Sequence, residues 1–569
     1  MALALSATTL CEAFQITAAR QPSHVALRTP GDAVSITWAT YADRVRRIAA
    51  GLASLGVQRG DTVALMLVNR PEFHLVDTAV LHLGATPFSI YNSSAPEQIA
   101  HLFANAGNRI VVTEHAFLPV LRAAITGSSV TRTIVVDGLD SAAGAAMSLQ
   151  QLESVGSKAL SDNNFDFDAA WRAVQPSDLA TLIYTSGTTG PPKGVELSHA
   201  NLLAEVRAVA DRIPLSSNGR TVSYLPSAHL ADRWVAHYQA SIGMGYTVTT
   251  IADPATVVTH LPDTRPTMWG GVPRVFEKIK AGLEAKGILD PASLTGPQRA
   301  AIVASLGLDE CTSLWVGGAP VQDEVVRYFH ALGLPLAEIL GMSETSCLIT
   351  ANPPDAIKIG SCGTAMRGVE LRLDDDGELL VRGPLVMVGY RGEPAKTRDA
   401  IDADGWFHSG DIATIDDDGY VSIVGRKKEI IINAAGKNMS PANIEAVLKS
   451  AHPLIGQAIV IGDRRPYNVA LIVLDPDTSA AFARTHGIAD VSTASLARDT
   501  IVGDSISAAV DAANERLSRV EQIKRFTVLD VDWQPDSDEL TPTMKLKRKP
   551  IADKYSHLVE DLYAVAASV

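Results

Sequence analysis

Short apolar runs alternate with amphipathic stretches through the first 360 residues or so. Runs of this length are typical of buried strands, and they stand at 62–67, 86–90, 109–113, 132–136, 179–183, 221–225, 246–250 and 313–316. Two of the stretches between them, 71–83 and 96–106, have the length and pattern of helices. Strands that alternate with helices are typical of α/β proteins with largely parallel sheets. We therefore predict an α/β fold for this part.

The pattern changes between about 360 and 424. Short apolar segments are separated there by Asp-Gly pairs at 376–377, 404–405 and 418–419. Asp-Gly between apolar runs favours tight hairpins. This part is expected to be a small antiparallel, β-barrel-like piece.

A third pattern follows the basic run 425–428. Strands are expected at 458–461 and 469–473, and helices at 443–450 and 505–519. This mixture predicts a small α+β domain. We expect a large domain over 1–425, which joins α/β subdomains to the barrel-like piece, and a C-terminal domain over 426–569, because 569 residues exceed one hydrophobic core.

Composition narrows the class of protein. The chain has 46% hydrophobic and 20% charged residues, as is ordinary for a soluble globular protein. Its net charge of −14 leaves no basic excess for binding nucleic acid. Four cysteines without paired spacing indicate neither a disulfide framework nor a zinc site. A reducing cytosol is therefore the expected compartment, and no apolar run is long enough for a membrane span.

The N-terminal segment could be mistaken for a signal peptide. It lacks a basic first region and carries Glu12, and Leu10, Phe14 and Ala18 recur every four residues. That spacing predicts an amphipathic helix that belongs to the fold.

The segment 184–194 carries the clearest chemical signal. It reads Tyr-Thr-Ser-Gly-Thr-Thr-Gly-Pro-Pro-Lys-Gly and lies between a short strand and a helix expected to begin near Ser198. Glycines let backbone N–H groups approach phosphate oxygens, hydroxyls donate hydrogen bonds, and a lysine offsets charge. It is not a Walker A loop, because Pro192 and Gly194 flank Lys193. The candidate phosphate ligands are Thr185, Ser186, Gly187, Thr188, Thr189, Gly190 and Lys193.

Further motifs follow this loop in a fixed order. They are Ser223-Tyr-Leu-Pro-Ser-Ala-His-Leu230, Gly271-Val-Pro-Arg-Val275, Gly317-Gly-Ala-Pro320, Gly341-Met-Ser-Glu-Thr345, Trp406-Phe-His-Ser-Gly-Asp411, Gly425-Arg-Lys-Lys-Glu429, Gly436-Lys-Asn-Met-Ser-Pro441 and Leu540-Thr-Pro-Thr-Met-Lys545. The series resembles the adenylate-forming superfamily of acyl-CoA synthetases, luciferases and adenylation domains, over almost the whole chain. The variants look most similar to long-chain fatty acid–CoA ligases.

The resemblance implies an ATP- and Mg²⁺-dependent ligase. A fatty acid carboxylate attacks the α-phosphorus of ATP, and the acyl-adenylate then passes its acyl group to coenzyme A. Glu344 is the implied magnesium ligand and Lys545, on a mobile C-terminal domain, the implied adenylating residue; Lys547 is the alternative to Lys545. The implied catalytic residues are Lys545, Glu344, Thr185 and His229, the last as a gate near the acyl carboxylate.

Other roles are implied by position in the same motifs. Asp411 and Arg426 would bind the ribose, Lys428 would be the hinge, and Gly436 would line the CoA path. Small and aromatic residues would form the acyl pocket, namely Trp234, Tyr238 and Gly271. The remaining implied nucleotide ligands are Gly317, Gly318, Ala319, Pro320, Gly341, Met342, Ser343 and Thr345.

Several alternatives stay open at this point. A fatty acyl-AMP ligase would load a carrier protein instead of CoA, and a silent nucleotide- or lipid-sensing paralogue would keep the fold without the chemistry. Medium- to long-chain fatty acids are expected, with aryl or branched acids as alternatives. Peripheral membrane contact and the oligomeric state are also left open by the sequence.

Overall fold

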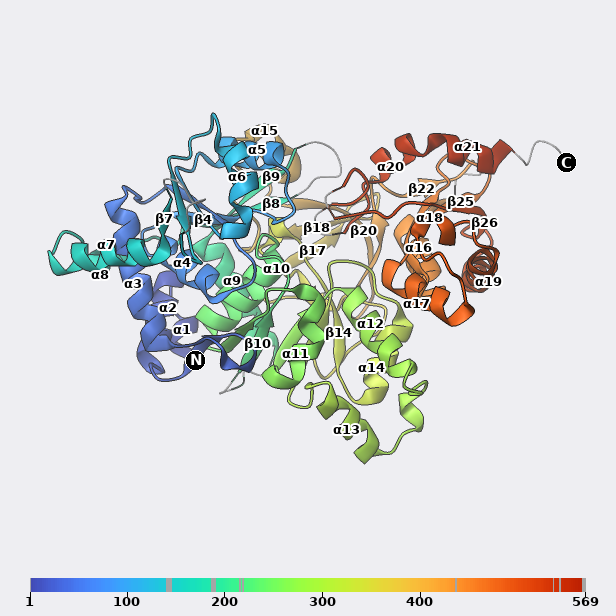
Figure 1. Cartoon of the computed structure of the whole chain (residues 1–569), viewed down its shortest axis with the longest axis horizontal. Coiled ribbons are helices and arrows are strands. Elements are labelled where there is room, and N and C mark those ends of the chain that lie inside the picture. Colours follow the sequence, from blue (N-terminus) through green and yellow to red (C-terminus); the bar gives the residue numbers. More distant parts are fainter. Residues whose placement is uncertain are drawn as a thin grey trace.

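The computed structural model describes residues 2–139, 146–185, 191–213, 216, 219–434, 437–535, 537–541 and 544–564. Sheets flanked by helices make up most of the molecule, which confirms the predicted α/β class. Figure 1 shows the chain passing from N-terminal elements at one end to C-terminal elements at the other.

The largest sheet lies in the N-terminal part. Its strands are β3 (Thr62–Met66), β4 (Thr86–Ser89), β5 (Ile110–Thr113), β6 (Arg132–Val135), β7 (Met147–Ser148), β8 (Leu179–Thr185), β9 (Lys193–Ser198) and β19 (Gly389–Tyr390), in the order β19-β9-β8-β4-β3-β5-β6-β7. Strands β3, β4 and β5 are parallel and wholly buried, which explains their continuous apolar runs. By contrast, β9 pairs antiparallel with both β8 and β19.

Helices cover this sheet. They are α1 (Ala2–Leu5), α2 (Leu10–Arg20), α3 (Trp38–Ser54), α4 (Pro71–Leu81), α5 (Pro96–Ala106), α6 (Leu118–Ile125), α7 (Leu149–Ser161), α8 (Phe167–Arg172) and α9 (His199–Arg212). The predicted N-terminal helix is α2, and its Phe14 is fully buried against Trp38 and Tyr41. Helix α2 therefore belongs to the fold, as the four-residue spacing predicted.

Two further sheets follow, one of which joins the early strands β1 and β2 to strands from the middle of the chain. One has the order β10-β11-β1-β2 and the other the order β12-β13-β14-β15-β16. Their strands are β1 (Val25–Arg28), β2 (Ser35–Thr37), β10 (Arg220–Ser223), β11 (Thr247–Thr250), β12 (Met268–Gly271), β13 (Ser313–Val316), β14 (Leu336–Leu340), β15 (Thr350–Ala351) and β16 (Thr364–Ala365). The helices here are α10 (Leu230–Asp232), α11 (Val257–Thr264), α12 (Pro273–Glu284), α13 (Gly296–Ser305), α14 (Asp323–Leu332) and the π-helix η3 (Arg233–Gly243).

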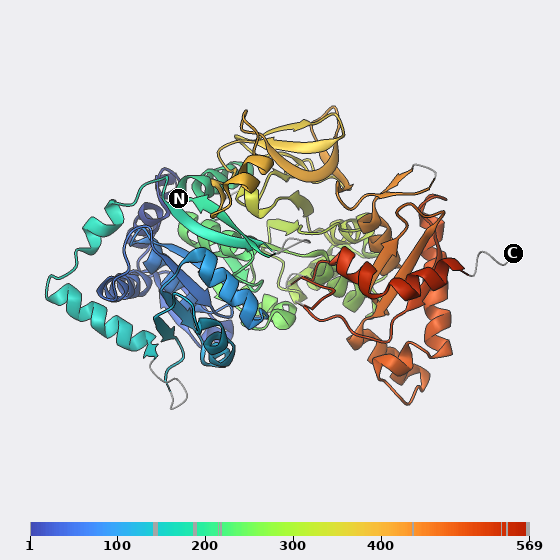
Figure 2. The ribbon, with the colours of Figure 1, turned by 90° about the horizontal axis from the view of Figure 1, so that it is seen from above.

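The predicted antiparallel piece is a sheet of β17 (Glu370–Leu373), β18 (Glu378–Arg382), β20 (Phe407–Ile415) and β21 (Val421–Arg426), with α15 (Pro394–Ala400) beside it. Gly377, Gly405 and Gly419 all have positive φ, as the Asp-Gly turns require. In Figure 2 this sheet, in yellow, lies along one side of the molecule.

The C-terminal elements gather at the opposite end from the N-terminus (Figures 1 and 2). They are β22 (Ile431–Ile432), β23 (Asn438–Met439), α16 (Pro441–Ala451), β24 (Ile455–Ile461), β25 (Asn468–Leu474), α17 (Pro476–His486), α18 (Thr493–Leu496), α19 (Thr500–Arg516), β26 (Ile523–Val528), α20 (Arg548–Lys554) and α21 (Ser556–Ala564). Their apolar clusters draw only on residues from Ile431 onward. The exact boundary at 425/426 stays a prediction.

Membrane spanning can be examined in the described helices. None of them combines the length and the apolar composition that crossing a bilayer requires.

Candidate active site

The candidate phosphate loop connects two antiparallel strands. Thr185 ends β8 and pairs with Lys193, the first residue of β9. The sequence analysis missed β9, which lies between the loop and the helix expected near Ser198. Helix α9 does begin at His199, capped by the Ser198 hydroxyl, but the five remaining residues of β9 separate Lys193 from it. The predicted ligands Ser186, Gly187, Thr188, Thr189 and Gly190 lie outside the described residues.

Lys193, Tyr390 and Glu344 come together from distant parts of the chain. The Lys193 ammonium lies 4.4 Å from the centre of the Tyr390 ring. The Tyr390 hydroxyl donates to Glu344 Oε1 at 2.9 Å. Burial and the charge of Glu344 raise the pKa of Tyr390, so the phenol stays protonated. The candidate phosphate and magnesium residues are thus neighbours, joined by one phenol that the motif analysis missed.

The loop that carries Glu344 is tightly folded. A side chain at Gly341 would bring its Cβ to 1.4 Å from the Cys347 carbonyl oxygen, so only glycine fits. Ser346 and Cys347 both have positive φ, at 57° and 123°. Non-glycine residues in this region carry strain, which is typical of functional loops. Within the loop Thr345 is buried and its hydroxyl donates back to the Met342 carbonyl, whereas Met342 and Ser343 are half-buried.

Helix α9 supports this loop from behind. Asn201 donates to the carbonyls of Pro384 and Val386, at 2.7 and 3.0 Å. One turn later, Glu205 accepts the Leu348 N–H at 3.0 Å. Burial raises the pKa of Glu205 well above its ordinary value, which favours the neutral carboxylic acid. One helix therefore anchors both the Glu344 loop and the segment leading to Tyr390.

Asp411 and Arg426 face each other on β20 and β21. They are register partners, and Arg426 Nε lies 2.8 Å from Asp411 Oδ1. Burial raises the pKa of Asp411, while Arg426 and Lys545 oppose the rise. The Asp411 carboxylate thus lies beside the charges of Arg426 and Lys545, where it could accept hydrogen bonds from ribose hydroxyls.

Lys545 belongs to the C-terminal part but contributes charge to the same place. Lys545 is exposed, yet desolvation by the surrounding protein lowers its pKa, and so does the charge of Arg426. The carboxylates of Asp411 and Glu344 act on it in the opposite direction. Lys547 is engaged elsewhere, because its ammonium donates to the Ser537 carbonyl at 2.7 Å.

The segment after β13 forms an open backbone wall. Gly317 donates its N–H to the Gly271 carbonyl at 3.2 Å, and Gly318 has a φ of 81°. Gly318, Ala319 and Pro320 are exposed. An accessible backbone wall of this kind could flank a flat base such as adenine.

His229 caps the short helix α10. Its Nδ1 accepts the Ala231 N–H at 3.1 Å, and burial together with the nearby Lys545 lowers its pKa to about 4. The imidazole is therefore neutral at physiological pH. Three residues later, Asp232 accepts hydrogen bonds from the backbone of Tyr224 and Leu225 and from the side chains of Ser223 and Asn69.

The predicted acyl-pocket residues lie in a closely packed region. Trp234 and Tyr238 are fully buried on the π-helix η3. The Tyr238 hydroxyl donates to Asp77 and accepts from Arg233, so it belongs to a buried polar cluster. Gly271 faces the Tyr224 hydroxyl, which a Cβ would approach to 2.4 Å.

The predicted hinge follows β21. Lys428 is exposed, and its neighbour Lys427 is anchored to Glu378 at 2.8 Å and to Asp376. Glu378 also groups with Asp374 and His408 in an arrangement that could hold a cation, but Lys427 already neutralises it. Gly436, the predicted CoA-path residue, lies outside the described residues.

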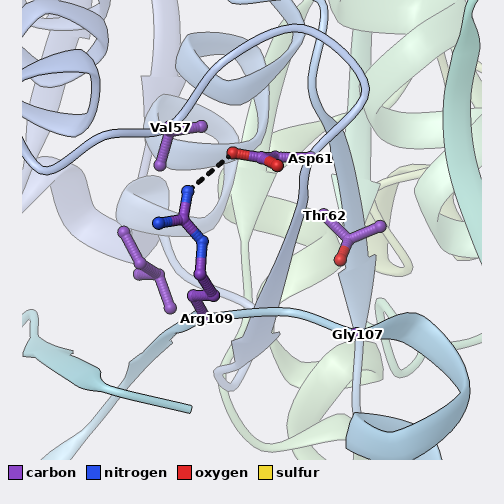
Figure 3. A pocket seen from close by; sticks show the side chains of 6 residues that line it. Val57, Asp61, Thr62, Gly107 and Arg109 are labelled. Carbon is purple, nitrogen blue, oxygen red and sulfur yellow. Dashed lines mark hydrogen bonds and ion pairs between the residues drawn. The ribbon is translucent and has the colours of Figure 1, made fainter. Parts of the chain in front are cut away.

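A small hollow lies at the amino ends of strands β3 and β5 of the large sheet (Figure 3). It is lined by Val57, Gly107 and the first residues of β3 and β5, and an ion pair joins Arg109 to Asp61 at 3.0 Å. Its volume of about 10 Å³ suits about one water molecule. Ligands of open α/β sheets bind at the carboxyl ends of the strands, and this hollow is at the amino ends.

Comparison with known proteins identifies the family. Residues 14–391 match the family model described as AMP-binding enzyme, and residues 428–567 match that of the AMP-binding enzyme C-terminal domain. The chain belongs to the AMP-binding enzyme family. This confirms the superfamily predicted from the ordered motifs.

Relatives of this AMP-binding enzyme agree with the predicted branch. It is 47% identical over 442 residues to the putative fatty-acid–CoA ligase fadD11 of Mycobacterium tuberculosis, with 71% of this chain and 77% of that protein covered. It is 35% identical over 565 residues to the long-chain-fatty-acid–CoA ligase FadD15 of Mycobacterium bovis, with 93% and 92% covered.

Solved structures show the same fold. The adenylation domain of a carboxylate reductase from Mycobacterium chelonae superposes with a TM-score of 0.78 at 22% identity, with 99% of this chain and 92% of that chain covered. ATP-bound MatB from Rhodopseudomonas palustris gives a TM-score of 0.73 at 22% identity, with 96% and 99% covered.

Proposed function

We propose that this AMP-binding enzyme is an ATP-dependent fatty acid–CoA ligase. The observation that carries the proposal is that Glu344, Asp411 and Lys545 lie close enough for the two carboxylates to act on the Lys545 ammonium. The three residues come from three motifs that lie up to 201 positions apart in the chain. Relatives named fatty-acid–CoA ligases, one of them covering 93% of the chain, support the substrate class.

The first half-reaction joins two anions. An oxygen of the fatty acid carboxylate attacks the α-phosphorus of ATP, the bond to the bridging oxygen breaks, and pyrophosphate leaves with that electron pair. Lys193 and the hydroxyl of Thr185 would bind the outgoing phosphates, together with the loop residues 186–190. Lys545 would stabilise the negative charge that develops between the carboxylate and the α-phosphate, which is commonly the largest catalytic contribution.

Glu344 fits a magnesium ion by its chemistry. A carboxylate oxygen is the hard donor that Mg²⁺ prefers, and the Lys193 ammonium nearby indicates where the phosphates would lie. When bound, Mg²⁺ would neutralise charge on the phosphate oxygens. Ser343 and Thr345 flank the ligand and would meet the α-phosphate.

The nucleoside would bind beside these groups. Asp411 would accept hydrogen bonds from both ribose hydroxyls, and Arg426, already 2.8 Å from it, would reach the ribose from the domain junction. Adenine would lie against the wall 317–320, and Gly341 and Met342, which follow β14, would border the base on its other side.

The second half-reaction transfers the acyl group to the thiol of coenzyme A. The thiolate attacks the acyl carbon and AMP leaves, which requires Lys545 to withdraw. We propose Lys428 as the hinge of this movement between segments 1–425 and 426–569, and Gly436 as the residue that lets the thiol pass. His229 would gate the carboxylate as a neutral imidazole.

The acyl chain is assigned to the region of Trp234, Tyr238 and Gly271. The close packing of these residues means that a medium or long chain would have to displace side chains to enter. A cytoplasmic location with peripheral membrane contact suits a substrate that partitions into bilayers.

The test is release of pyrophosphate from ATP with carboxylic acids of increasing length and with aryl acids, each with and without CoA. Release that depends on a fatty acid, with acyl-CoA formed only when CoA is present, is expected. Acyl-adenylate that ignores CoA would instead indicate an acyl-AMP ligase for a carrier protein. Bound ATP without turnover across the panel would favour the sensing paralogue.

A further inference from the structure

Tyr390 lies between two residues of opposite charge that both need to meet ATP. Its ring lies under the Lys193 ammonium at 4.4 Å, and its hydroxyl donates to Glu344 at 2.9 Å. Within the described ranges, no ion pair joins Lys193 to Glu344 or to any other carboxylate. The lysine and the carboxylate are therefore close to each other but not paired.

The backbone around Tyr390 is fixed to both neighbours. Strand β19 pairs with β9, with Tyr390 opposite Val195, and the Arg391 N–H donates to the Gly194 carbonyl at 2.8 Å. On the other side, the Met387 N–H donates to the Glu344 carbonyl at 2.8 Å. The segment 387–391 thus connects the strand that begins with Lys193 to the loop that carries Glu344.

The separation matters because opposite charges in a partly buried site attract strongly. A direct ion pair between Lys193 and Glu344 would have to be broken before the lysine could bind phosphate and the carboxylate could bind a cation. An aromatic face holds an ammonium group through its quadrupole without neutralising it. A phenol likewise satisfies a carboxylate while leaving it charged.

We propose that Tyr390 is a positioning residue that holds Lys193 and Glu344 apart, each charged and available to its ligand. This inference rests on the proposed function only in taking ATP as the ligand. It concerns nucleotide binding, so it can be tested without fatty acid or CoA.

The first experiment measures ATP binding without magnesium by calorimetry in two variants. Tyr390→Phe keeps the ring and should bind ATP within about twofold of the wild type, because Lys193 retains its contact. Tyr390→Leu removes both contacts and lets Lys193 pair with Glu344. We expect its ATP affinity to fall by about tenfold or more, since the new ion pair competes with phosphate.

A second-site change separates this effect from general damage. Glu344→Gln in the Tyr390→Leu protein removes the competing charge and should restore metal-free ATP binding to within about threefold of the wild type. The same change in the wild-type background measures what loss of the Glu344 charge alone does to metal-free binding, and the rescue in the Tyr390→Leu protein should exceed that effect. If Tyr390 served only to maintain the structure, Glu344→Gln would not restore ATP binding in the Tyr390→Leu protein.

Tyr328→Phe provides a matched control. Tyr328 is also buried, also has a lysine over its ring, Lys280 at 5.6 Å, and donates its hydroxyl at 2.7 Å to a carbonyl, that of Ile288. Because none of these groups belongs to the proposed site, Tyr328→Phe should bind ATP as the wild type does.

If Tyr390→Leu fails to fold, Tyr390→Phe still decides the matter through its magnesium dependence. Without the phenol to orient Glu344, the Mg²⁺ concentration for half-maximal nucleotide binding should rise by about threefold or more. An unchanged magnesium dependence, undiminished ATP binding by Tyr390→Leu, or no rescue by Glu344→Gln would overturn the inference. Failure of the wild type to bind ATP would overturn the proposed nucleotide site as well.

Discussion

Replacing Glu205 by leucine tests whether helix α9 holds the loop that carries Glu344. Glu205 is fully buried, and one of its oxygens accepts the Leu348 N–H at 3.0 Å. Leucine fills a similar volume but accepts no hydrogen bond. The change therefore leaves a buried N–H without a partner, in a loop already strained at Ser346 and Cys347.

The expected loss of stability follows from that single bond. A buried donor left unsatisfied costs about 1–3 kcal/mol, and removal of a buried carboxylic acid offsets part of this. For the family segment 14–391, an unfolding entropy of about 2.1 cal/mol/K per residue gives about 0.8 kcal/mol/K. The melting temperature of Glu205→Leu should fall by about 1–4 °C.

Glutamine at the same position tests whether the Glu205 side chain is neutral or charged in the folded protein. The pKa of Glu205 is raised, so its contribution to stability is fully present below its ordinary value of 4.5 and is lost as pH rises toward the folded-state value. The loss is at most about 1.4 kcal/mol per pH unit. Glu205→Gln keeps an acceptor, but its unfolding free energy has no such dependence on pH. Its melting temperature should therefore rise relative to that of the wild type as pH increases above 4.5.

The assay pairs melting curves over a series of pH values with amide hydrogen exchange of the segment 341–349. Exchange should be faster in Glu205→Leu and unchanged in Glu205→Gln. Asp211→Asn is the control, since Asp211 is an exposed carboxylate on the same helix. The idea of a neutral acceptor at Glu205 would be refuted if leucine and glutamine lowered the melting temperature equally. It would also be refuted if the melting temperature of Glu205→Gln did not rise relative to that of the wild type with increasing pH.

Three further predictions concern the two half-reactions. Lys545→Ala should reduce fatty-acid-dependent pyrophosphate release by about 10² or more, whereas Lys547→Ala, whose ammonium binds a backbone carbonyl, should keep most of the activity; equal losses would refute the assignment. Arg274 on α12 pairs with Asp475 of the C-terminal part, so Asp475→Asn removes a contact that the proposed domain movement would have to break. Single-turnover assays should then show thioester formation faster relative to adenylation by a few-fold, as suits a pair of about 1 kcal/mol. A slower thioester step would contradict this. Gly436→Leu should spare adenylation and block thioester formation, and loss of both halves would exclude a thiol-path role.

Much of the fold could be predicted because the signals are local. Strands β3, β4 and β5 appear as continuous apolar runs since both of their faces are buried, and the Asp-Gly turns identify the antiparallel sheet through the positive φ of the glycine. Strand β9 was missed because its six residues mix charged and apolar side chains, and its stability comes from pairing with β8 and β19. Pairing with β19 joins positions almost 200 residues apart, which no local window detects.

The sequence by itself determined the family and the chemistry that its motifs imply, because residue types and their order can be read without knowing where they lie in space. Only the tertiary structure decided which groups meet. Tyr390 carries no charge and stands in no motif singled out from the sequence, yet the pairing of β19 with β9 brings it between Lys193 and Glu344. The raised pKa of Glu205 likewise follows from complete burial. Both are consequences of long-range packing, in which the surroundings of a side chain depend on segments remote in the chain.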